Sequence, residues 1–328
     1  SDVCSSDLRA TRSSPVWPRS SPMAQTPYSW LANPSRTREV LDGFGLYTKH
    51  RLGQNFLVND SVIGRILGLA ELGEKDVVFE VGPGIGTLTV SMLPHAGAVC
   101  SVEADRTLPP VLAQTCARDS ERFALLEGDA LRVDVGALTD VVRNLGIEGL
   151  DPAPTKLVSN LPYQVAATII LKTFEQMPTI GRAVVMVQAE VADRISAKPG
   201  SKAYGAYTAK LSLLGTVTGR FEVGPGNFMP PPHVDSAVVR IDRDPARDPA
   251  TGEPLAPAML EATRGVIEAA FAQRRKTIRN SMSSAGYAKD ALDEALSATG
   301  IEPTARAETL ATEDFIRLAD ALSQVGRE

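Results

Sequence analysis

From about Asp60 onward, short apolar runs alternate with amphipathic stretches along the chain. Apolar residues recur at helical spacing directly after Asp60, which we expect to be the N-cap of that helix. Five apolar runs of strand length follow, at residues 77–81, 98–102, 123–126, 156–159 and 183–187. The stretches between them are long enough for helical crossovers. The pattern therefore predicts a βαβ series with a largely parallel sheet.

Two further runs, 217–223 and 236–241, flank a stretch rich in Gly and Pro, which predicts an antiparallel pair at one sheet edge. Residues 244–257 hold four prolines among Asp, Arg, Gly and Ala, a composition typical of a linker. Beyond it, residues 258–271, 278–284, 290–299 and 311–325 have the pattern of short helices. We expect an α/β domain over 36–243, a linker over 244–257 and a small all-α domain over 258–328.

Residues 1–35 show no hydrophobic periodicity and are rich in Ser, Pro and Arg, so we expect them to be disordered. Asp2, Asp7 and the lack of an apolar core argue against a targeting peptide. Because the chain begins without Met and Met23 opens a more regular segment, residues 1–22 are candidates for non-native sequence and are excluded from the fold prediction.

Bulk composition narrows the class of protein. A chain of 328 residues that is 43% hydrophobic can bury one full core and a smaller second one. No run approaches the roughly 20 apolar residues of a membrane span, so we expect no membrane insertion. Three cysteines without metal-ligand spacing indicate a reducing compartment, with Cys100 and Cys116 as packing residues. We expect no metal site.

The formal net charge of -5 argues mildly against a nucleic-acid partner, but net charge averages over all faces. Arg274, Arg275, Lys276 and Arg279 fall within six residues just past the predicted linker. A second basic group near the start of the fold consists of Arg36, Arg38, Lys49, His50 and Arg51. The first group is either a solvated helix face or a contact for RNA phosphates, and its position favours the phosphates.

A glycine loop follows the first predicted strand, with Gly82, Gly84 and Gly86 at alternate positions. Such a loop can be merely a tight strand-to-helix turn, or it can bring the backbone close to a ligand. Glu80 precedes it and would repel the pyrophosphate of a dinucleotide. A ligand that carries an amino group fits better.

Two more acids end the second and third predicted strands, at the sheet edge where open α/β folds bind ligands. Glu103 is placed to accept ribose hydroxyls, and Asp129 lies where an adenine amino group would sit. Each acid alone could be a solvated loop residue. Together with Glu80 and the glycines, the set favours S-adenosyl-L-methionine over NAD, on the Rossmann-like sheet of class I methyltransferases.

Asn160-Leu161-Pro162-Tyr163 follows the fourth predicted strand and fits methyl transfer to an exocyclic aromatic amine. The Asn160 side-chain oxygen and the backbone carbonyl at Leu161-Pro162 can accept both N–H bonds, which favours the positive charge that grows on the nitrogen. Pro162 fixes the turn, and Tyr163 can stack on the base. Asn-x-Pro is also an ordinary turn signal. By itself the motif leaves both DNA and RNA open as substrates.

A base that reacts must leave its stack, which calls for a second flat wall opposite Tyr163. Phe228, before Met229-Pro230-Pro231-Pro232, is the candidate. The alternative is a buried aromatic of an edge strand.

With these motifs in order, the chain resembles the ribosomal RNA adenine N6,N6-dimethyltransferases, which modify two adjacent adenines in a hairpin loop near the 3' end of small-subunit (16S) RNA. The match covers about residues 48–282. It rests on Leu52-Gly53-Gln54-Asn55-Phe56-Leu57, the loop from Glu80 to Gly86, the Asn160 motif, and three later blocks at residues 199–205, 228–238 and 271–277.

The resemblance implies cofactor contacts at Asn55, Leu57, Gly82, Glu103, Asp129 and Asn160, with Gln54 nearby, and RNA contacts that include Lys202. It also implies a cytoplasmic enzyme that acts on the assembling 30S subunit during ribosome biogenesis, and we expect a monomer. Gln164 and Ala189 depart from the residues common in the family, which puts RNA fit and rate in doubt.

Three alternatives stay open. The large-subunit adenine methyltransferases of the macrolide-resistance type share the glycine loop and an Asn-x-Pro-aromatic motif, although the 199–205 block and the helical tail favour the small-subunit branch. A non-catalytic ribosome-assembly or transcription factor could use the same fold. An NAD-binding oxidoreductase would need a cofactor that tolerates Glu80.

Overall fold

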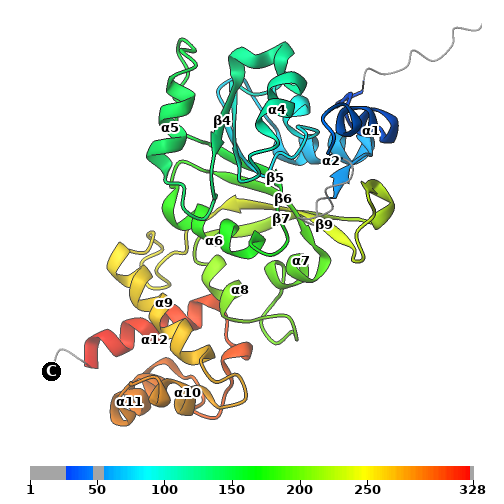
Figure 1. The fold of residues 1–328 in the computed structure, drawn as a ribbon. Coiled ribbons are helices and arrows are strands. Elements are labelled where there is room, and N and C mark those ends of the chain that lie inside the picture. The colour runs from blue at the N-terminus through cyan, green and yellow to red at the C-terminus, as the bar shows by residue number, and fades with distance from the viewer. Residues whose placement is uncertain (1–26, 47–54, 326–328) are drawn as a thin grey trace, which may run out of the picture.

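The computed structural model describes residues 27–46 and 55–325 and shows a three-layer α/β fold with a helical tail (Figure 1). The strands are β1 (Phe56–Leu57), β2 (Val77–Val81), β3 (Ala98–Glu103), β4 (Phe123–Glu127), β5 (Lys156–Asn160), β6 (Arg182–Gln188), β7 (Gly215–Val223), β8 (Phe228–Met229) and β9 (Ser236–Arg243). The helices of the α/β part are α1 (Pro34–Gly43), α2 (Asp60–Ala70), α3 (Thr89–Met92), α4 (Pro109–Thr115), α5 (Val135–Arg143), α6 (Ala166–Gln176), α7 (Ala189–Ile195) and α8 (Ala206–Leu211).

The main sheet has the strand order β4-β3-β2-β5-β6-β9-β7. The first five strands in this order are parallel, and β9 is antiparallel to both β6 and β7. The predicted parallel series and the antiparallel edge pair are therefore confirmed. A separate two-stranded sheet pairs β1 with β8.

Alternate residues of the buried strands face two different apolar layers, as the two-residue period of a strand requires. Val77, Phe79 and Val81 belong to a cluster with α5 and α6, whereas Val78 and Val99 pack with α2 and α4. Cys100 and Cys116 are buried, and burial raises the pKa of both thiols to about 12, so the predicted packing role is confirmed.

Residues 27–35 are ordered, so the expectation of disorder through residue 35 is wrong for this segment. Leu31 is fully buried, and the Asn33 side chain accepts hydrogen bonds from Ser35 and Arg36 at the start of α1. No periodic pattern marks this segment because a few buried residues suffice to anchor so short a stretch of chain. The predicted N-cap at Asp60 is also displaced: Asn59 caps α2.

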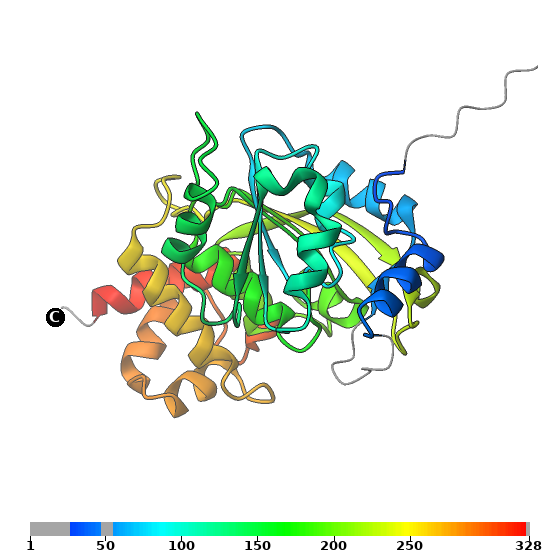
Figure 2. The same cartoon turned by 45° about the horizontal axis from the view of Figure 1, so that its top comes forward.

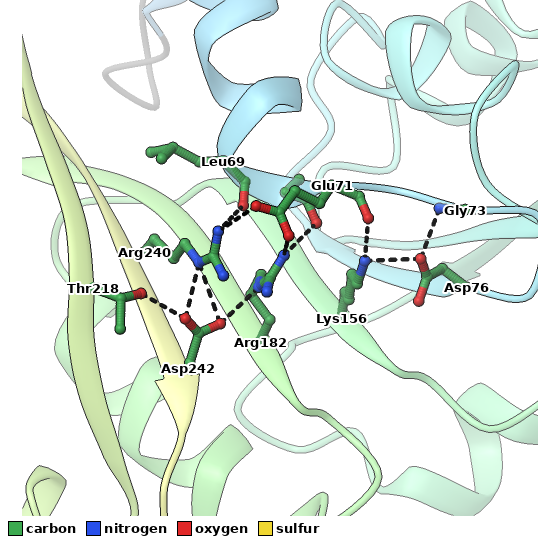
Figure 3. A network of polar contacts seen from close by, with 10 residues as sticks. Leu69, Glu71, Gly73, Asp76, Lys156, Arg182, Thr218, Arg240 and Asp242 are labelled. Atoms are coloured by element: carbon green, nitrogen blue, oxygen red, sulfur yellow. Dashed lines mark hydrogen bonds and ion pairs between the residues drawn. The ribbon is translucent and has the colours of Figure 1, made fainter.

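A charged network ties strands together at the sheet edge where the parallel strands begin (Figure 3). Arg182 and Arg240 both donate to Glu71, at the end of α2, and to Asp242. Thr218 also donates to Asp242. Partial burial would raise the pKa of Asp242, but these three donors outweigh it and hold the pKa below its ordinary value. The network fixes β6, β9 and β7 against α2.

The tail consists of α9 (Pro257–Phe271), α10 (Ile278–Ser284), α11 (Lys289–Thr299) and α12 (Thr312–Val325). Residues 244–256 contain no helix or strand beyond an isolated bridge between Arg247 and Pro254. The tail packs beneath the sheet in both views (Figures 1 and 2). No helix in the described ranges has the length and apolar character that crossing a membrane requires.

The loop between α7 and α8 fastens the tail to the α/β part. Tyr204 packs against Phe271, which packs in turn against Phe315, with ring centroids 6.1 and 5.9 Å apart. The Tyr204 hydroxyl donates to the carbonyl of Leu310 at 3.1 Å. Buried residues of the sheet, α6, α9 and α12 form one continuous apolar cluster.

Candidate active site

A cavity of about 640 Å³ opens where β2, β3, β4 and β5 end, at the carboxyl edge of the parallel strands. Its volume lies within the roughly 300–1,000 Å³ typical of small-molecule sites. Its lining includes most residues predicted for the cofactor and the reaction: Asn55, Leu57, Glu80, Gly82, Gly84, Glu103, Asp129, Asn160, Leu161, Pro162 and Tyr163. Gln54 lies outside the described residues. The structure thus brings together motifs that are 105 residues apart, from Asn55 to Asn160.

Glycine is required in the loop after β2 because the backbone there is left-handed and closely packed. Gly82 has φ +66° and Gly84 has φ +60°. A Cβ on Gly82 would lie 3.4 Å from Cγ of Pro162, and one on Gly84 would lie 3.3 Å from Cε1 of Phe56. Gly86 does not line the cavity; it packs against α4. The loop therefore packs between Pro162 of the predicted catalytic motif and Phe56 of β1.

Glu80 is almost fully buried beside the cavity, and its Oε2 accepts hydrogen bonds from Ser101 Oγ at 2.7 Å and Thr89 Oγ1 at 2.8 Å. Burial raises the pKa of Glu80 to about 7 against the effect of these donors. A cation in the cavity would favour the ionised form. The sequence did not single out Ser101 or Thr89, because a Ser in a strand and a Thr in a helix carry no signal of their own.

Glu103, also buried, ends β3, and its Oε1 accepts from the backbone N–H of Asp105 at 2.8 Å. Burial raises the pKa of Glu103, and backbone N–H donors oppose that rise. Asp129 is more exposed and accepts from the N–H of Leu131 at 2.9 Å. Successive strands thus present carboxylates along one side of the cavity, an arrangement that suits a ligand with hydroxyl, amino and cationic groups.

The predicted catalytic motif begins on Asn160, the last residue of β5. Asn160 pairs with Met186 of β6, and the N–H of Leu161 donates to the carbonyl of Met186 at 3.0 Å. Within the described residues, no hydrogen bond engages the Asn160 side-chain amide. The backbone fixes Asn160, while its amide oxygen stays available as an acceptor at the cavity wall.

Tyr163 is held at its hydroxyl end, which lies 2.7 Å from Oγ of Ser236 on β9. Ser236 has no exposed surface, whereas Tyr163 is half-buried, so the hydrogen bond is partly buried. The phenol ring lines the cavity beside Asn160. Ser236 lies in the family block at residues 228–238, but its role could not be predicted from the sequence because its partner is 73 residues away.

Phe228 does not join this site in the structure. It is 3% exposed, pairs with Leu57 across β1 and β8, and belongs to the apolar cluster that includes α2. It is absent from the cavity lining. Of the two interpretations of Phe228, its burial supports the packing one, and a stacking role would require its ring to move.

The predicted RNA contacts lie on the surface where the tail meets the α7–α8 loop. Lys202, Arg275 and Lys276 are exposed. Arg274 donates to the carbonyl of Lys202 at 2.8 Å, which joins the two segments. Arg279 makes a two-pronged ion pair with Asp293, so its charge is neutralised locally. Among the described residues, no group of three His, Cys, Asp or Glu side chains could hold a metal ion.

Three kinds of similarity relate this chain to known proteins. Ribosomal RNA small subunit methyltransferase A of Acidothermus cellulolyticus is 41% identical over 288 residues, which cover 87% of this chain and 92% of that protein. The protein of the same name from Thermobifida fusca is 38% identical over 294 residues, with coverages of 88% and 96%.

Among solved structures, a dimethyladenosine transferase from Plasmodium falciparum has a TM-score of 0.67 at 23% identity and covers 83% of this chain and 98% of its own. The 23S rRNA methyltransferase ErmE has a TM-score of 0.61 at 27% identity, with coverages of 82% and 100%. The family model described as ribosomal RNA adenine dimethylase matches residues 45–324. With its sheet order, its cavity and these similarities, the chain belongs to the ribosomal RNA adenine dimethylase family.

Proposed function

We propose that this protein transfers methyl groups from S-adenosyl-L-methionine to N6 of two adjacent adenines in a hairpin loop near the 3' end of small-subunit ribosomal RNA. The observation that carries the proposal is that Asn160-Leu161-Pro162-Tyr163 lines the same cavity as Glu80, Glu103 and Asp129. The relatives named as small subunit methyltransferases support this choice of RNA.

The residues that line the cavity fit the methyl donor along the order of the strands. Asp129 after β4 would accept from the adenine amino group, and Glu103 at the end of β3 would accept from the ribose hydroxyls. The glycine loop after β2 would face the amino-acid end, with Glu80 beneath it. This order points the remaining end of the ligand toward Asn160 on β5. When bound, the donor supplies a methyl group on a positively charged sulfur.

The chain itself would orient the acceptor and stabilise the charge that develops on it. The Asn160 amide oxygen and the Leu161 carbonyl accept the two N–H bonds of the target amine. Their backbone is held because Asn160 pairs with Met186 of β6 and the Leu161 N–H donates to the Met186 carbonyl. Tyr163 stacks on the adenine, with its ring orientation set by Ser236. Removal of the amine proton after transfer requires no protein base, since water can accept it.

We assign substrate contacts outside the cavity to Lys202, Arg275 and Lys276, the exposed cations where the tail meets the α7–α8 loop. Local clusters of this kind allow a chain of net charge -5 to bind phosphates. The assembling 30S subunit is the proposed substrate particle.

The test is to incubate the protein with labelled S-adenosyl-L-methionine and undermethylated 30S subunits, 50S subunits or DNA, and then to digest the nucleic acid to nucleosides. We expect labelled N6,N6-dimethyladenosine in small-subunit RNA alone. Label in 50S RNA would indicate the activity for which ErmE is named and would refute the substrate assignment. An absence of label from all three would refute the enzymatic proposal.

A further inference from the structure

The segment before α1 carries two exposed aromatic side chains. Tyr28 is 52% exposed and Trp30 is 46% exposed. Across residues 27–46 and 55–325, Val234 is the one other large hydrophobic side chain that is comparably exposed. Single exposed apolar residues are ordinary on protein surfaces, but two aromatics within three residues are a candidate interaction site.

This segment is tied down along its backbone and is not a fraying end. The N–H groups of Tyr28 and Ser29 donate to the two carboxylate oxygens of Asp60 at 3.1 and 2.8 Å. Ser29 Oγ donates to the carbonyl of Thr87 at 2.7 Å. Ser29 and Leu31 are buried at 2% and 0% exposure. The alternation of burial directs these two inward and leaves Tyr28 and Trp30, at the alternate positions, facing solvent.

The Tyr28 ring rests directly on α2. Gly64 has no side chain, and a Cβ built there would lie 2.5 Å from Cε2 of Tyr28. The glycine therefore makes room for the ring, which is supported from below while about half of the residue stays open. An aromatic ring held in this way loses little conformational freedom when a flat partner stacks on it.

The segment is fastened to the wall of the cavity. Thr87, which receives the Ser29 hydrogen bond, lines the cavity, as does Phe56. Phe56 packs in the same apolar cluster as Leu31 and Ile85. The segment that carries the two aromatics is therefore anchored to residues that line the cavity. Both views place α1 at the end of the molecule away from the tail (Figures 1 and 2).

We propose that Tyr28 and Trp30 form a stacking surface for unpaired nucleotides of the RNA substrate that flank the target adenine. The proposal rests on the proposed function, since it takes its partner from that reaction. An adenine that enters the cavity leaves its neighbours without a stacking partner, and an aromatic ring can replace that partner for any base. Exposed arginines at Arg38 on α1 and Arg65 on α2 add positive charge for the adjoining phosphates.

The experiment compares two double variants in the full-length protein. Tyr28→Ala with Trp30→Ala removes both rings, whereas Tyr28→Phe with Trp30→Phe keeps flat rings and serves as the matched control. We expect the alanine pair to raise Kd for a hairpin-loop RNA and KM for 30S subunits by about 10- to 100-fold. The phenylalanine pair should stay within about threefold of wild type. Val234→Ala, at the third exposed site, should change neither quantity.

Two further measurements separate stacking from structural support. Gly64→Ala keeps Tyr28 but displaces its ring, so RNA binding should weaken although no aromatic is lost. The Kd for S-adenosyl-L-methionine and the unfolding midpoint should remain near those of wild type for the alanine pair.

Each contrary outcome overturns a different statement. Unchanged RNA affinity in the alanine pair refutes the stacking surface. Loss of cofactor affinity together with RNA affinity would show that the segment only supports the glycine loop, which also refutes it. Weaker binding to 30S subunits with unchanged binding to protein-free RNA would assign the surface to a ribosomal protein. If the wild-type protein leaves small-subunit RNA unmethylated, the proposed function itself fails, independently of these variants.

Discussion

The hydrogen bond between Tyr163 and Ser236 allows a direct test of how the proposed catalytic motif is positioned. Tyr163→Phe keeps the stacking ring but leaves the Ser236 hydroxyl buried without a partner, which costs about 1–3 kcal/mol. Ser236→Ala leaves the Tyr163 hydroxyl at the half-buried end of a ring, where water can reach it, and should cost about 1 kcal/mol. Removing both partners should cost little free energy beyond that lost in the worse of the two single variants.

The assay is a double-variant cycle on kcat/KM for undermethylated 30S subunits, with the free energy of unfolding measured for each protein. At about 1.4 kcal/mol per factor of ten, Ser236→Ala should lower kcat/KM about fivefold and Tyr163→Phe about 5- to 140-fold. The combined variant should be no slower than Tyr163→Phe. Losses that multiply in the double variant would show that the two groups act independently, and would refute positioning by this bond.

Three other outcomes follow from the site. Asn160→Ala should lower methyl transfer by at least about 100-fold while calorimetry still detects cofactor binding; a near-normal rate would exclude the amide as an acceptor. Because burial raises the pKa of Glu80 from 4.5 to about 7, the free protein should lose stability as pH rises from about 4.5 through 7. Thermal unfolding of Glu80→Gln should lack this pH dependence. If the variant loses stability over the same pH range as the wild type, the titration of Glu80 is not the cause. Replacing Arg275 and Lys276 by Gln should reduce the slope of log K for RNA binding against log salt concentration by about 1.4. Arg279→Gln should change this slope little, because Arg279 is already paired with Asp293. Equal changes in slope would show that Arg279 contacts RNA phosphates as Arg275 and Lys276 do.

The parallel sheet and most of its strands could be predicted because buried strands read as continuous apolar runs. The position of the acids and glycines of the cavity could also be predicted, because the carboxyl ends of parallel strands meet at one edge of the sheet. Asn55 and Leu57 came only from the family resemblance. Their own positions read as a loop, and nothing local indicates that β1 pairs with β8 more than 170 residues later.

The failures have a common physical origin in contacts between distant segments. Ordering of residues 27–35 depends on Asp60 and Thr87, which no local pattern links to that segment. Phe228 could be assigned equally well to a stack or to a core, because an aromatic ring suits both. Ser236 and Tyr163 meet only after β9 has inserted beside β6, so their hydrogen bond is a property of the topology.

The continuous apolar cluster that joins the tail to the sheet holds these two parts of the molecule at a fixed distance from each other. Because Tyr204, Phe271 and Phe315 lock the two parts, the span from Asn160 to the cations at Arg275 and Lys276 is set by packing and not by a flexible tether. With the proposed contacts at Asn160, Arg275 and Lys276, a substrate would have to present its reactive base and its distal phosphates at one fixed separation. That fixed distance could by itself select a substrate, because an RNA of the wrong shape would fail to reach both sites whatever its base sequence.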